Sequence, residues 1–191
     1  METKFIEAPW HKEDPQYFGP ETRSLFFSED ITPKTSMNLI SQLLELNARS
    51  SDPIKLYINT NGGSLVDAFA IFDTIKAIRS PVYTIVKGLC ASGGLILLLA
   101  GSKRYATENS LFFYHQPILT TGKLVSLEHS QGVSEIYTLS KDLFDDKIKT
   151  ITNMSNSLWL QNFEGRTYKY FNSENAKSMG FIHKTIQTIG D

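Results

Sequence analysis

Three short segments of the chain carry residue types that together could catalyse acyl transfer. Ser92 lies among small residues just before a wholly apolar run, His115 precedes a Gln-Pro pair, and Gly62 and Gly63 are adjacent. A serine hydroxyl is a weak nucleophile unless a base takes its proton and backbone N–H groups stabilise the oxyanion that forms. A helix beginning at Gly93 would supply such N–H groups, and histidine is the most frequent base. One hypothesis is therefore that Ser92 is a nucleophile, with His115 the histidine whose surroundings set it apart from the others.

Each segment also has a purely structural interpretation. A serine in front of a helix is commonly its N-cap, as Ser92 would be, and a histidine such as His115 can be satisfied by a backbone carbonyl. Glycine pairs are common in tight turns. The other histidines have no comparable surroundings: His11, His129 and His183. The functional hypothesis therefore depends on all three segments and their order, not on any one of them.

The hydrophobic pattern places each segment at the end of a strand. Residues 54–59 alternate as a strand that leads into the glycine pair, and residues 81–86 form the strand before Ser92. Residues 111–114 are also strand-like and end at His115. The order of strand, glycine turn and helix thus occurs twice, and alternating strands and helices favour an α/β layered fold.

Helices are predicted between these strands. Ser64 and Asp67 form a capping box after the glycine pair, and residues 93–100 are apolar enough for a buried helix. Residues 1–23, with three prolines, show no periodicity and are expected to be an irregular arm, and residues 24–191 a single α/β domain. The remaining predicted elements are a strand over Ser24–Phe27, a helix after the Thr32-Pro33 N-cap, a long helix over residues 124–152, a short helix capped by Ser173 and ended by Gly180, and a last strand over residues 181–186.

Composition limits the class of protein. A chain of 191 residues suits one domain, and 19 basic against 20 acidic residues give no reason to expect nucleic acid or an anionic membrane as a partner. The only cysteine, Cys90, and the lack of a signal-peptide pattern predict a reducing, cytoplasmic compartment. The longest apolar run, residues 95–100, is far shorter than the about 20 residues that span a bilayer. No cofactor or metal ion is expected.

The ordered segments resemble those of the proteolytic subunit of the Clp proteases. The resemblance covers about residues 24–186, and the spacing from Gly63 to Ser92 is kept without a gap. The matching segments are Tyr57-Ile58-Asn59-Thr60-Asn61-Gly62-Gly63, Ala91-Ser92-Gly93-Gly94 and His115-Gln116-Pro117. The resemblance implies that Ser92 is the nucleophile and His115 the general base of peptide-bond hydrolysis. It also implies an oxyanion hole made by the N–H groups of Gly63 and Gly93.

The same resemblance implies a crotonase-like spiral of strand–helix units with a projecting handle at about residues 117–152. In the family, two seven-membered rings meet through the handles and enclose a chamber, which an ATP-driven unfoldase supplies with unfolded polypeptide. We therefore expect a homo-oligomer of this kind. Tyr57 and Tyr105 match aromatic positions of the pocket that receives the unfoldase loops. Apolar residues lie on two sides of the predicted long helix: Val133, Ile136, Tyr137, Leu143 and Phe144 on one stripe, with Leu139 and Ile148 off it.

The chain departs from the family at the third catalytic residue. The family's aspartate aligns with Lys169, or with Tyr168 after a shift of one residue, and the nearest carboxylate in the sequence is Glu164. Replacing that aspartate by asparagine lowers turnover about ten-thousandfold in a serine protease. Asn172, Tyr168 or a backbone carbonyl would have to hold His115 instead, so reduced or conditional activity is expected.

Two other functions stay open on the sequence alone. A non-catalytic ring subunit that assembles with active homologues fits the missing aspartate but not the retention of both Ser92 and His115. A crotonase-type binding protein or lyase would use Gly63 and Gly93 to polarise a thioester carbonyl, yet it needs no serine–histidine pair.

Overall fold

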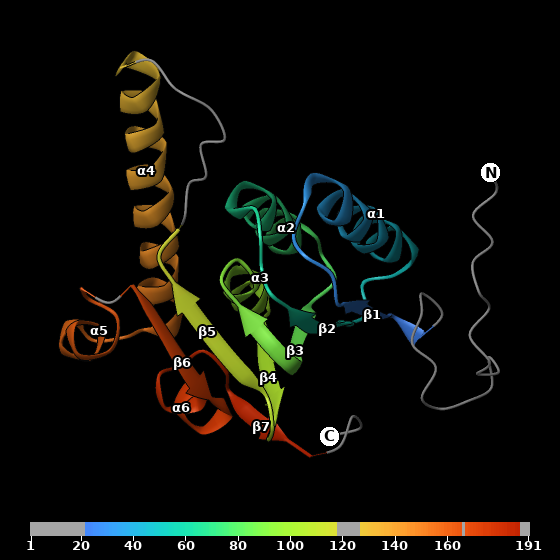
Figure 1. Cartoon of the computed structure of the whole chain (residues 1–191). Coiled ribbons are helices and arrows are strands. Elements are labelled where there is room, and N and C mark those ends of the chain that lie inside the picture. The colour runs from blue at the N-terminus through green and yellow to red at the C-terminus, as the bar shows by residue number, and fades with distance from the viewer. Residues whose placement is uncertain (1–21, 118–126, 166, 188–191) are drawn as a thin grey trace.

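A seven-stranded sheet organises the part of the chain that the computed structural model describes, residues 22–117, 127–165 and 167–187 (Figure 1). The strands are β1 (Ser24–Phe27), β2 (Ile54–Thr60), β3 (Val82–Ala91), β4 (Lys103–Thr107), β5 (Leu111–His115), β6 (Tyr168–Asn172) and β7 (Lys184–Ile186). Strands β1, β2, β3, β4 and β7 lie side by side in that order, all parallel. Strand β5 pairs in parallel with β3, and β6 adds to β5 in the antiparallel direction.

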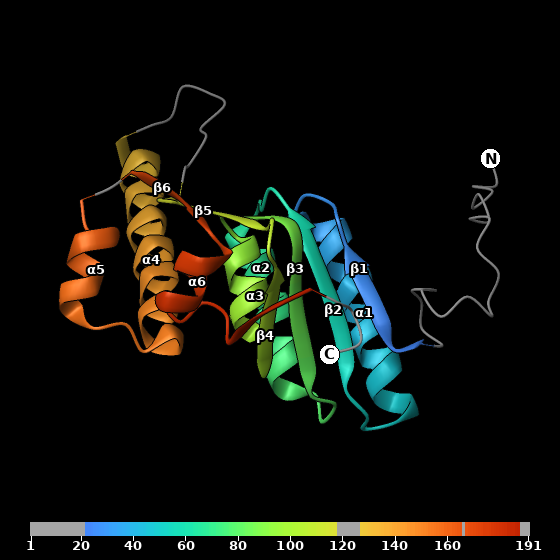
Figure 2. The same cartoon turned by 90° about the horizontal axis from the view of Figure 1, so that it is seen from below.

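Six helices accompany the sheet in the described residues. They are α1 (Pro33–Arg49), α2 (Leu65–Ala77), α3 (Gly94–Ala100), α4 (Leu127–Thr152), α5 (Asn156–Asn162) and α6 (Ser173–Ser178). Figure 2 shows α1, α2 and α3 side by side on one face of the parallel strands, while α4, α5 and α6 gather at the end where β5 and β6 lie. The strand-and-helix succession predicted around Ser92 is thus present.

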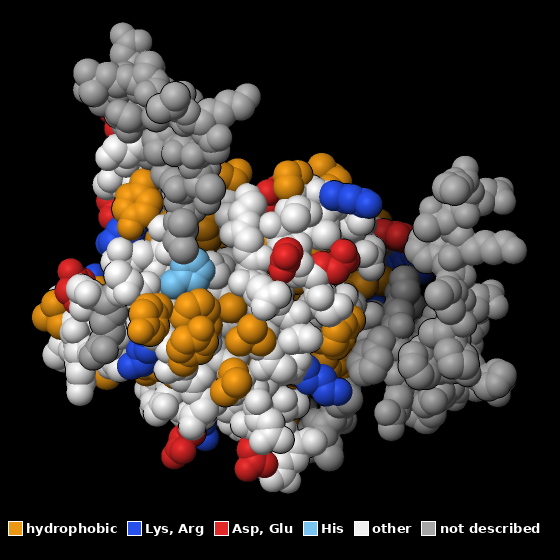
Figure 3. Space-filling view, in the orientation of Figure 1, with side chains coloured by type: hydrophobic (Ala, Val, Ile, Leu, Met, Phe, Trp, Pro, Cys, Tyr) orange, Lys and Arg blue, Asp and Glu red, His pale blue; other side chains and the backbone are white. Residues whose placement is uncertain are grey.

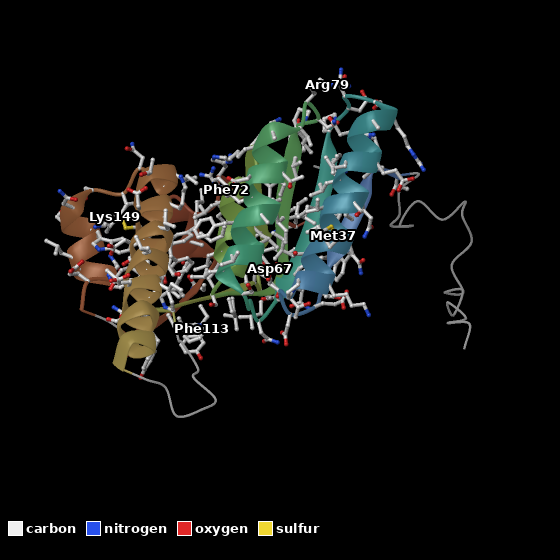
Figure 4. All side chains as sticks on the ribbon, turned by 90° about the horizontal axis from the view of Figure 1, so that it is seen from above. Met37, Asp67, Phe72, Arg79, Phe113 and Lys149 are labelled. Atoms are coloured by element: carbon white, nitrogen blue, oxygen red, sulfur yellow. The ribbon has the colours of Figure 1, made fainter. Side chains whose placement is uncertain are left out.

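Polar residues start the first two helices where the sequence predicted. The Thr32 hydroxyl accepts from the backbone N–H of Thr35, and the backbone N–H of Thr32 donates to the Thr35 hydroxyl. These two bonds form a capping box at the start of α1. Ser64 accepts from the N–H of Asp67 at 3.3 Å. A capping box would also have the Asp67 carboxylate accept from the N–H of Ser64. It accepts instead from the Ser36 hydroxyl of α1 at 3.2 Å. Asp67 therefore joins α1 to α2, between which it lies in Figure 4.

The apolar run after Ser92 forms the central helix of the core. Every residue of α3 is buried, from Gly94 to Ala100. It packs against α2 and β3, and its carbonyl of Leu98 accepts from the buried Thr84 hydroxyl at 2.8 Å. Among the described residues, no helix combines the length and apolarity needed to cross a bilayer.

Strand β3 changes partner halfway along its length. Its first part pairs with β4 from Tyr83 to Val86, and its last part pairs with β5 from Leu89 to Ala91. Between them, the register with β2 shifts, and Asn59 of β2 accepts from the N–H of Leu89 at 2.9 Å. The shift lets β3 run beyond the predicted residues 81–86 and end directly before Ser92.

Helix α4 has an apolar surface that the described chain does not cover. Phe144 and Ile148 are buried, whereas Ile136, Leu139 and Leu143 have 57%, 64% and 51% of their surface exposed. The predicted stripe grouped Ile136 and Leu143 with Phe144 and is therefore wrong, because the first two side chains are exposed and the third is buried. Phe72 of α2 points towards α4 (Figure 4), with the Lys147 ammonium 5.8 Å from its ring. Residues 118–126, the start of the predicted handle, lie outside the described residues.

The remaining differences from the sequence prediction are short elements. Strands β4 and β6 and helix α5 were not predicted, and β7 spans only the end of the predicted strand. Asn172, not Ser173, caps α6 by accepting from the N–H of Asn175. The Ser173 hydroxyl instead donates to the carbonyl of Thr107 at 2.7 Å. Most of the predicted arm, residues 1–21, lies outside the described residues, while Arg23 donates to the carbonyl of Leu46 at the end of α1.

A buried arginine fixes the turn between α6 and β7. The Arg104 guanidinium of β4 donates to the carbonyls of Phe181 at 2.8 Å and Gly180 at 3.1 Å. Gly180 has φ +81°, in the left-handed region, and a Cβ atom there would press against the carbonyl oxygen of Thr152. The turn therefore requires glycine.

Replacing Gly180 with alanine should lower the free energy of unfolding by about 2 kcal/mol or more, because a side chain at positive φ costs roughly 1–2 kcal/mol before any clash. The midpoint of urea unfolding, followed by circular dichroism, measures this. Gly132→Ala in α4 is the control, since its Cβ would meet nothing within 4 Å. It should stabilise by up to about 1 kcal/mol. Equal midpoints for the two variants would contradict the left-handed turn at Gly180.

Candidate active site

The two predicted turns contact each other through their backbones. A Cβ atom on Gly62 would lie 2.7 Å from the Cβ of Ser92 and 2.9 Å from the amide nitrogen of Gly93. Gly62 has φ +91°, so both its conformation and its closeness to Ser92 exclude a side chain. A Cβ on Gly93 would in turn lie 3.4 Å from the carbonyl oxygen of Gly63. The structure thus brings Gly63, Ser92 and Gly93 together at the ends of β2 and β3.

Ser92 adopts a backbone conformation that serines rarely use. Its φ is +53°, in the left-handed region, at the sharp turn from β3 into α3. The N-cap of α3 is Gly93, with no side-chain capping bond, so the simple capping role for Ser92 does not apply. Among the described residues its hydroxyl has no hydrogen-bond partner. A serine held on a strained strand-to-helix turn is also how α/β-hydrolases present their nucleophile.

Two backbone donors at this turn are unused. Among the described residues, neither the N–H of Gly63 nor that of Gly93 donates to a backbone acceptor. The neighbouring groups are occupied, since the carbonyl of Gly62 accepts from Ile31 at 2.7 Å and the N–H of Ser64 donates to Ile31 at 2.9 Å. Free N–H groups beside a nucleophile are what an oxyanion hole requires.

His115 ends β5, the strand beside the serine turn. The N–H of Ser92 donates to the carbonyl of Phe113 at 2.8 Å, and the rings of Phe113 and His115 are 5.2 Å apart. Nδ1 of His115 lies 2.7 Å from the carbonyl oxygen of Gln116. Because a carbonyl only accepts, Nδ1 carries the proton and the neutral ring has its lone pair on Nε2. In the sequence Gln116 is only the middle residue of the His-Gln-Pro motif, and no sequence pattern identifies its carbonyl as the partner of the ring.

No carboxylate of the described residues bonds to the His115 ring. In the antiparallel pairing of β5 with β6, Tyr168 lies opposite His115 and Lys169 opposite Tyr114. Paired residues share a face of the sheet, so Tyr168 is on the His115 side and Lys169 on the core side, where its ammonium bonds to Asn162. Lys169 is therefore not placed to contact the histidine ring.

Two other side chains that could have held the His115 ring, Glu164 and Asn172, bond to other partners. Glu164 accepts from the indole N–H of Trp159 at 2.8 Å, and the Asn172 side chain caps α6. The carbonyl of Gln116 is thus the orienting partner that the structure provides.

Aromatic side chains surround His115 on its face of the sheet. Phe113 stacks on Tyr170 with 4.1 Å between ring centroids. Leu111, Tyr168 and Tyr170 are all more than half exposed, at 55%, 63% and 66%. Figure 3 shows the resulting apolar surface over β5 and β6. A polypeptide that approaches His115 from this side would meet apolar groups.

Tyr57 and Tyr105, the predicted docking residues, lie elsewhere on the sheet. Tyr57 is only 1% exposed and forms a small apolar cluster with Ile85 and Ile186, against which Tyr105 packs. Burial raises the pKa of the Tyr57 phenol. Alternation along β2 puts Tyr57 opposite the core residues Leu56 and Ile58, so this cluster lies on the sheet face away from α1, α2 and α3.

Comparison with known proteins agrees with this architecture. The model of the Clp protease family matches residues 18–189. The ATP-dependent Clp protease proteolytic subunit 2 of Prochlorococcus marinus (strain MIT 9312) is 36% identical over 174 residues, covering 86% of this chain and 81% of that protein. Subunit 3 of Synechococcus sp. (strain CC9605) is 34% identical over 168 residues, with 86% and 82% covered.

A solved structure gives the same result for the fold. A point mutant of ClpP1 from Listeria monocytogenes superposes with a TM-score of 0.79 over 89% of this chain and 94% of that one, at 24% identity. The predicted α/β fold of ClpP type is thereby confirmed. Since the family model spans nearly the whole chain and relatives exceed one third identity, this chain belongs to the Clp protease family.

Proposed function

We propose that this chain is a serine endopeptidase subunit that hydrolyses peptide bonds of unfolded polypeptides. Ser92 is the nucleophile, His115 its general base, and the N–H groups of Gly63 and Gly93 are the oxyanion donors. The observation that carries the proposal is the backbone contact between the two glycine turns, which holds a strained serine beside two N–H groups that bond to no backbone acceptor of the described residues. The relatives are named as proteolytic subunits, which supports the same activity.

In the proposed reaction, the His115 lone pair on Nε2 takes the proton of the Ser92 hydroxyl as the oxygen attacks the substrate carbonyl. The two glycine N–H groups stabilise the oxyanion, and loss of one such donor costs about a hundred- to a thousandfold in turnover. The protonated ring then gives its proton to the leaving amine. Water attacks the acyl-enzyme with the same groups acting in reverse, and no cofactor takes part in these steps.

The proposal includes assembly into two stacked seven-membered rings. Ile136, Leu139 and Leu143 place exposed apolar surface on α4, which supports contact with a second copy through this helix. An ATP-dependent unfoldase would deliver substrate, docking at the cluster that contains Tyr57 and Tyr105. Because Tyr57 is itself buried, its part would be to support that surface, while Tyr105 would contact the partner.

A catalytically weak subunit that assembles with active homologues is the second candidate. The observation in its favour is that the His115 ring is held by a neutral carbonyl and by no carboxylate of the described residues. A carbonyl sets the tautomer but stabilises the imidazolium less than a full negative charge. The two candidates differ in whether Ser92 reacts.

A fluorophosphonate probe should label the purified protein at Ser92, one probe per subunit, as measured by intact mass and peptide mapping. Ser92→Ala should abolish labelling. His115→Ala should slow it by about a hundred- to ten-thousandfold, the usual contribution of a general base. Labelling that is equally fast without His115 would contradict the proposed dyad, and no labelling in an assembled protein would favour the non-catalytic subunit.

A carboxylate on the His115 face should accelerate the reaction. Tyr168→Asp would introduce one opposite His115, and we expect labelling of Ser92 at least about tenfold faster, since an aspartate in this role is worth up to about ten-thousandfold. Lys169→Asp is the matched control, because that side chain leaves on the core side. Acceleration by Lys169→Asp alone would contradict the pairing of Tyr168 with His115.

Leu139→Glu on α4 should separate the proposed double ring. The Leu139 side chain is 64% exposed in the single chain. The proposed contact between rings would bury it, and a charge buried there without a partner is costly. Sedimentation velocity should then report half the mass of the wild-type particle. Leu160→Glu on α5 is the control, since that leucine is similarly exposed, at 61%. An unchanged particle mass for Leu139→Glu would exclude this surface of α4 as the contact.

A further inference from the structure

The residues before and after His115 are both bonded to helix α4. The Tyr114 hydroxyl donates to Oδ1 of Asp145 at 2.8 Å, and the Tyr137 hydroxyl donates to Oε1 of Gln116 at 3.2 Å. Positions 137 and 145 are eight residues apart, a spacing that keeps both within one broad face of α4. The end of β5 is thus tied to one face of this helix at two points, one on each side of the candidate base.

The Tyr114–Asp145 bond is buried and electrostatically supported. Tyr114 is 1% and Asp145 9% exposed, and Lys141 donates to the other carboxylate oxygen at 2.9 Å. Burial and the adjacent Asp145 raise the pKa of Tyr114, so its phenol stays protonated and donates. The bond to Asp145 also raises the pKa of Lys141. The Tyr114 ring lies 4.9 Å from that of Phe163, which restricts it further.

The Tyr137–Gln116 bond acts on the peptide group that orients the histidine. The Gln116 N–H donates to the carbonyl of Thr167 at 3.1 Å, and its own carbonyl accepts from Nδ1 of His115. The next residue is Pro117, which has no N–H and a fixed φ. The direction of this carbonyl therefore depends on how residue 116 is held, and its side chain is held by Tyr137.

We infer that Tyr137 and Asp145 are positioning residues for His115, through Gln116 and Tyr114 respectively. The inference depends on the proposed role of His115 as general base. Neither residue touches the reacting atoms. Together they fix the strand end and the carbonyl that hold the imidazole, a task that an aspartate on the ring performs in other serine hydrolases. Activity in this chain thereby becomes sensitive to the placement of α4.

The test compares Tyr137→Phe and Asp145→Asn with wild type in fluorophosphonate labelling of Ser92. Tyr137→Phe should lower the maximal labelling rate by roughly three- to tenfold, the effect of one neutral hydrogen bond, and Asp145→Asn by at least as much, because it removes the charge of the acceptor. The probe concentration at half-maximal rate should stay unchanged in both. Tyr83→Phe, which removes a phenol from the distant sheet face, should label at the wild-type rate. Circular dichroism and sedimentation establish that fold and assembly are intact in every variant.

A double-mutant cycle separates positioning from a general loss of stability. If Tyr137 acts through Gln116, the variant Tyr137→Phe/Gln116→Leu should label no more slowly than the slower single variant. The same holds for Asp145→Asn combined with Tyr114→Phe. Multiplying effects in both cycles would overturn the inference.

A second readout does not depend on reactivity. Nitrogen NMR of protein labelled in its histidine rings should show His115 as the Nδ1–H tautomer in wild type and as a tautomer mixture in Tyr137→Phe, with His115→Gln providing the assignment. An unchanged His115 signal in Tyr137→Phe and Asp145→Asn, with wild-type labelling rates, overturns the positioning role. If wild type is not labelled at all, the proposed peptidase activity fails, and the tautomer comparison alone decides the positioning role.

Discussion

The contact between the two backbone turns is the constraint on which the site depends. Gly62 approaches Ser92 and Gly93 so closely that any side chain at position 62 would displace them. Such closeness is possible only because β2 and β3 are neighbouring parallel strands that end at the same edge of the sheet. Their register is set by core residues such as Leu56 and Val86, since a slip of one residue would turn these side chains to the opposite face. The packing of the core thus determines the position of the serine.

The same core offsets the strain at Ser92. A non-glycine residue in the left-handed region costs on the order of 1–3 kcal/mol. After the two glycines that follow it, five consecutive leucine and isoleucine side chains of α3 are fully buried, each worth about 1.5–3 kcal/mol. The bond from the Ser92 N–H to Phe113 connects the strained residue to β5 as well. A conformation that is unfavourable locally is therefore held by packing on the helix that follows it.

The sequence predicted the elements that carry strong local signals. Thr32-Pro33 and Ser64 begin helices as expected, and the order of strand, turn and helix around Ser92 is the observed one. Strand β6 escaped prediction because its residue types do not follow its burial: Tyr168 and Tyr170 are exposed, while the less exposed position between them is Lys169. The Ser64–Asp67 capping box was only half right, since Asp67 bonds across to α1, a tertiary contact that no local pattern encodes.

Residue types suggested which residues form the candidate site, but not how their side chains are oriented. The alternatives Lys169 and Tyr168 could not be separated in the sequence, because a shift of one residue in a strand reverses the face on which a side chain lies. The pairing of β6 with β5 resolves this, and it removes the lysine from the histidine side. It also leaves the ring to a backbone carbonyl, which no side-chain pattern could reveal.

A carbonyl differs from a carboxylate in what it can do for an imidazole. Both accept from Nδ1 and so select the tautomer that leaves Nε2 free to take a proton. Only the carboxylate brings a full charge that favours the imidazolium formed during the reaction. A carbonyl is also fixed to the main chain, so the ring moves whenever the peptide moves. In the proposed mechanism, the orientation of His115 therefore depends on the rigidity of β5 and on the helix bonded to its end, whereas in a serine–histidine–aspartate triad one aspartate orients the ring.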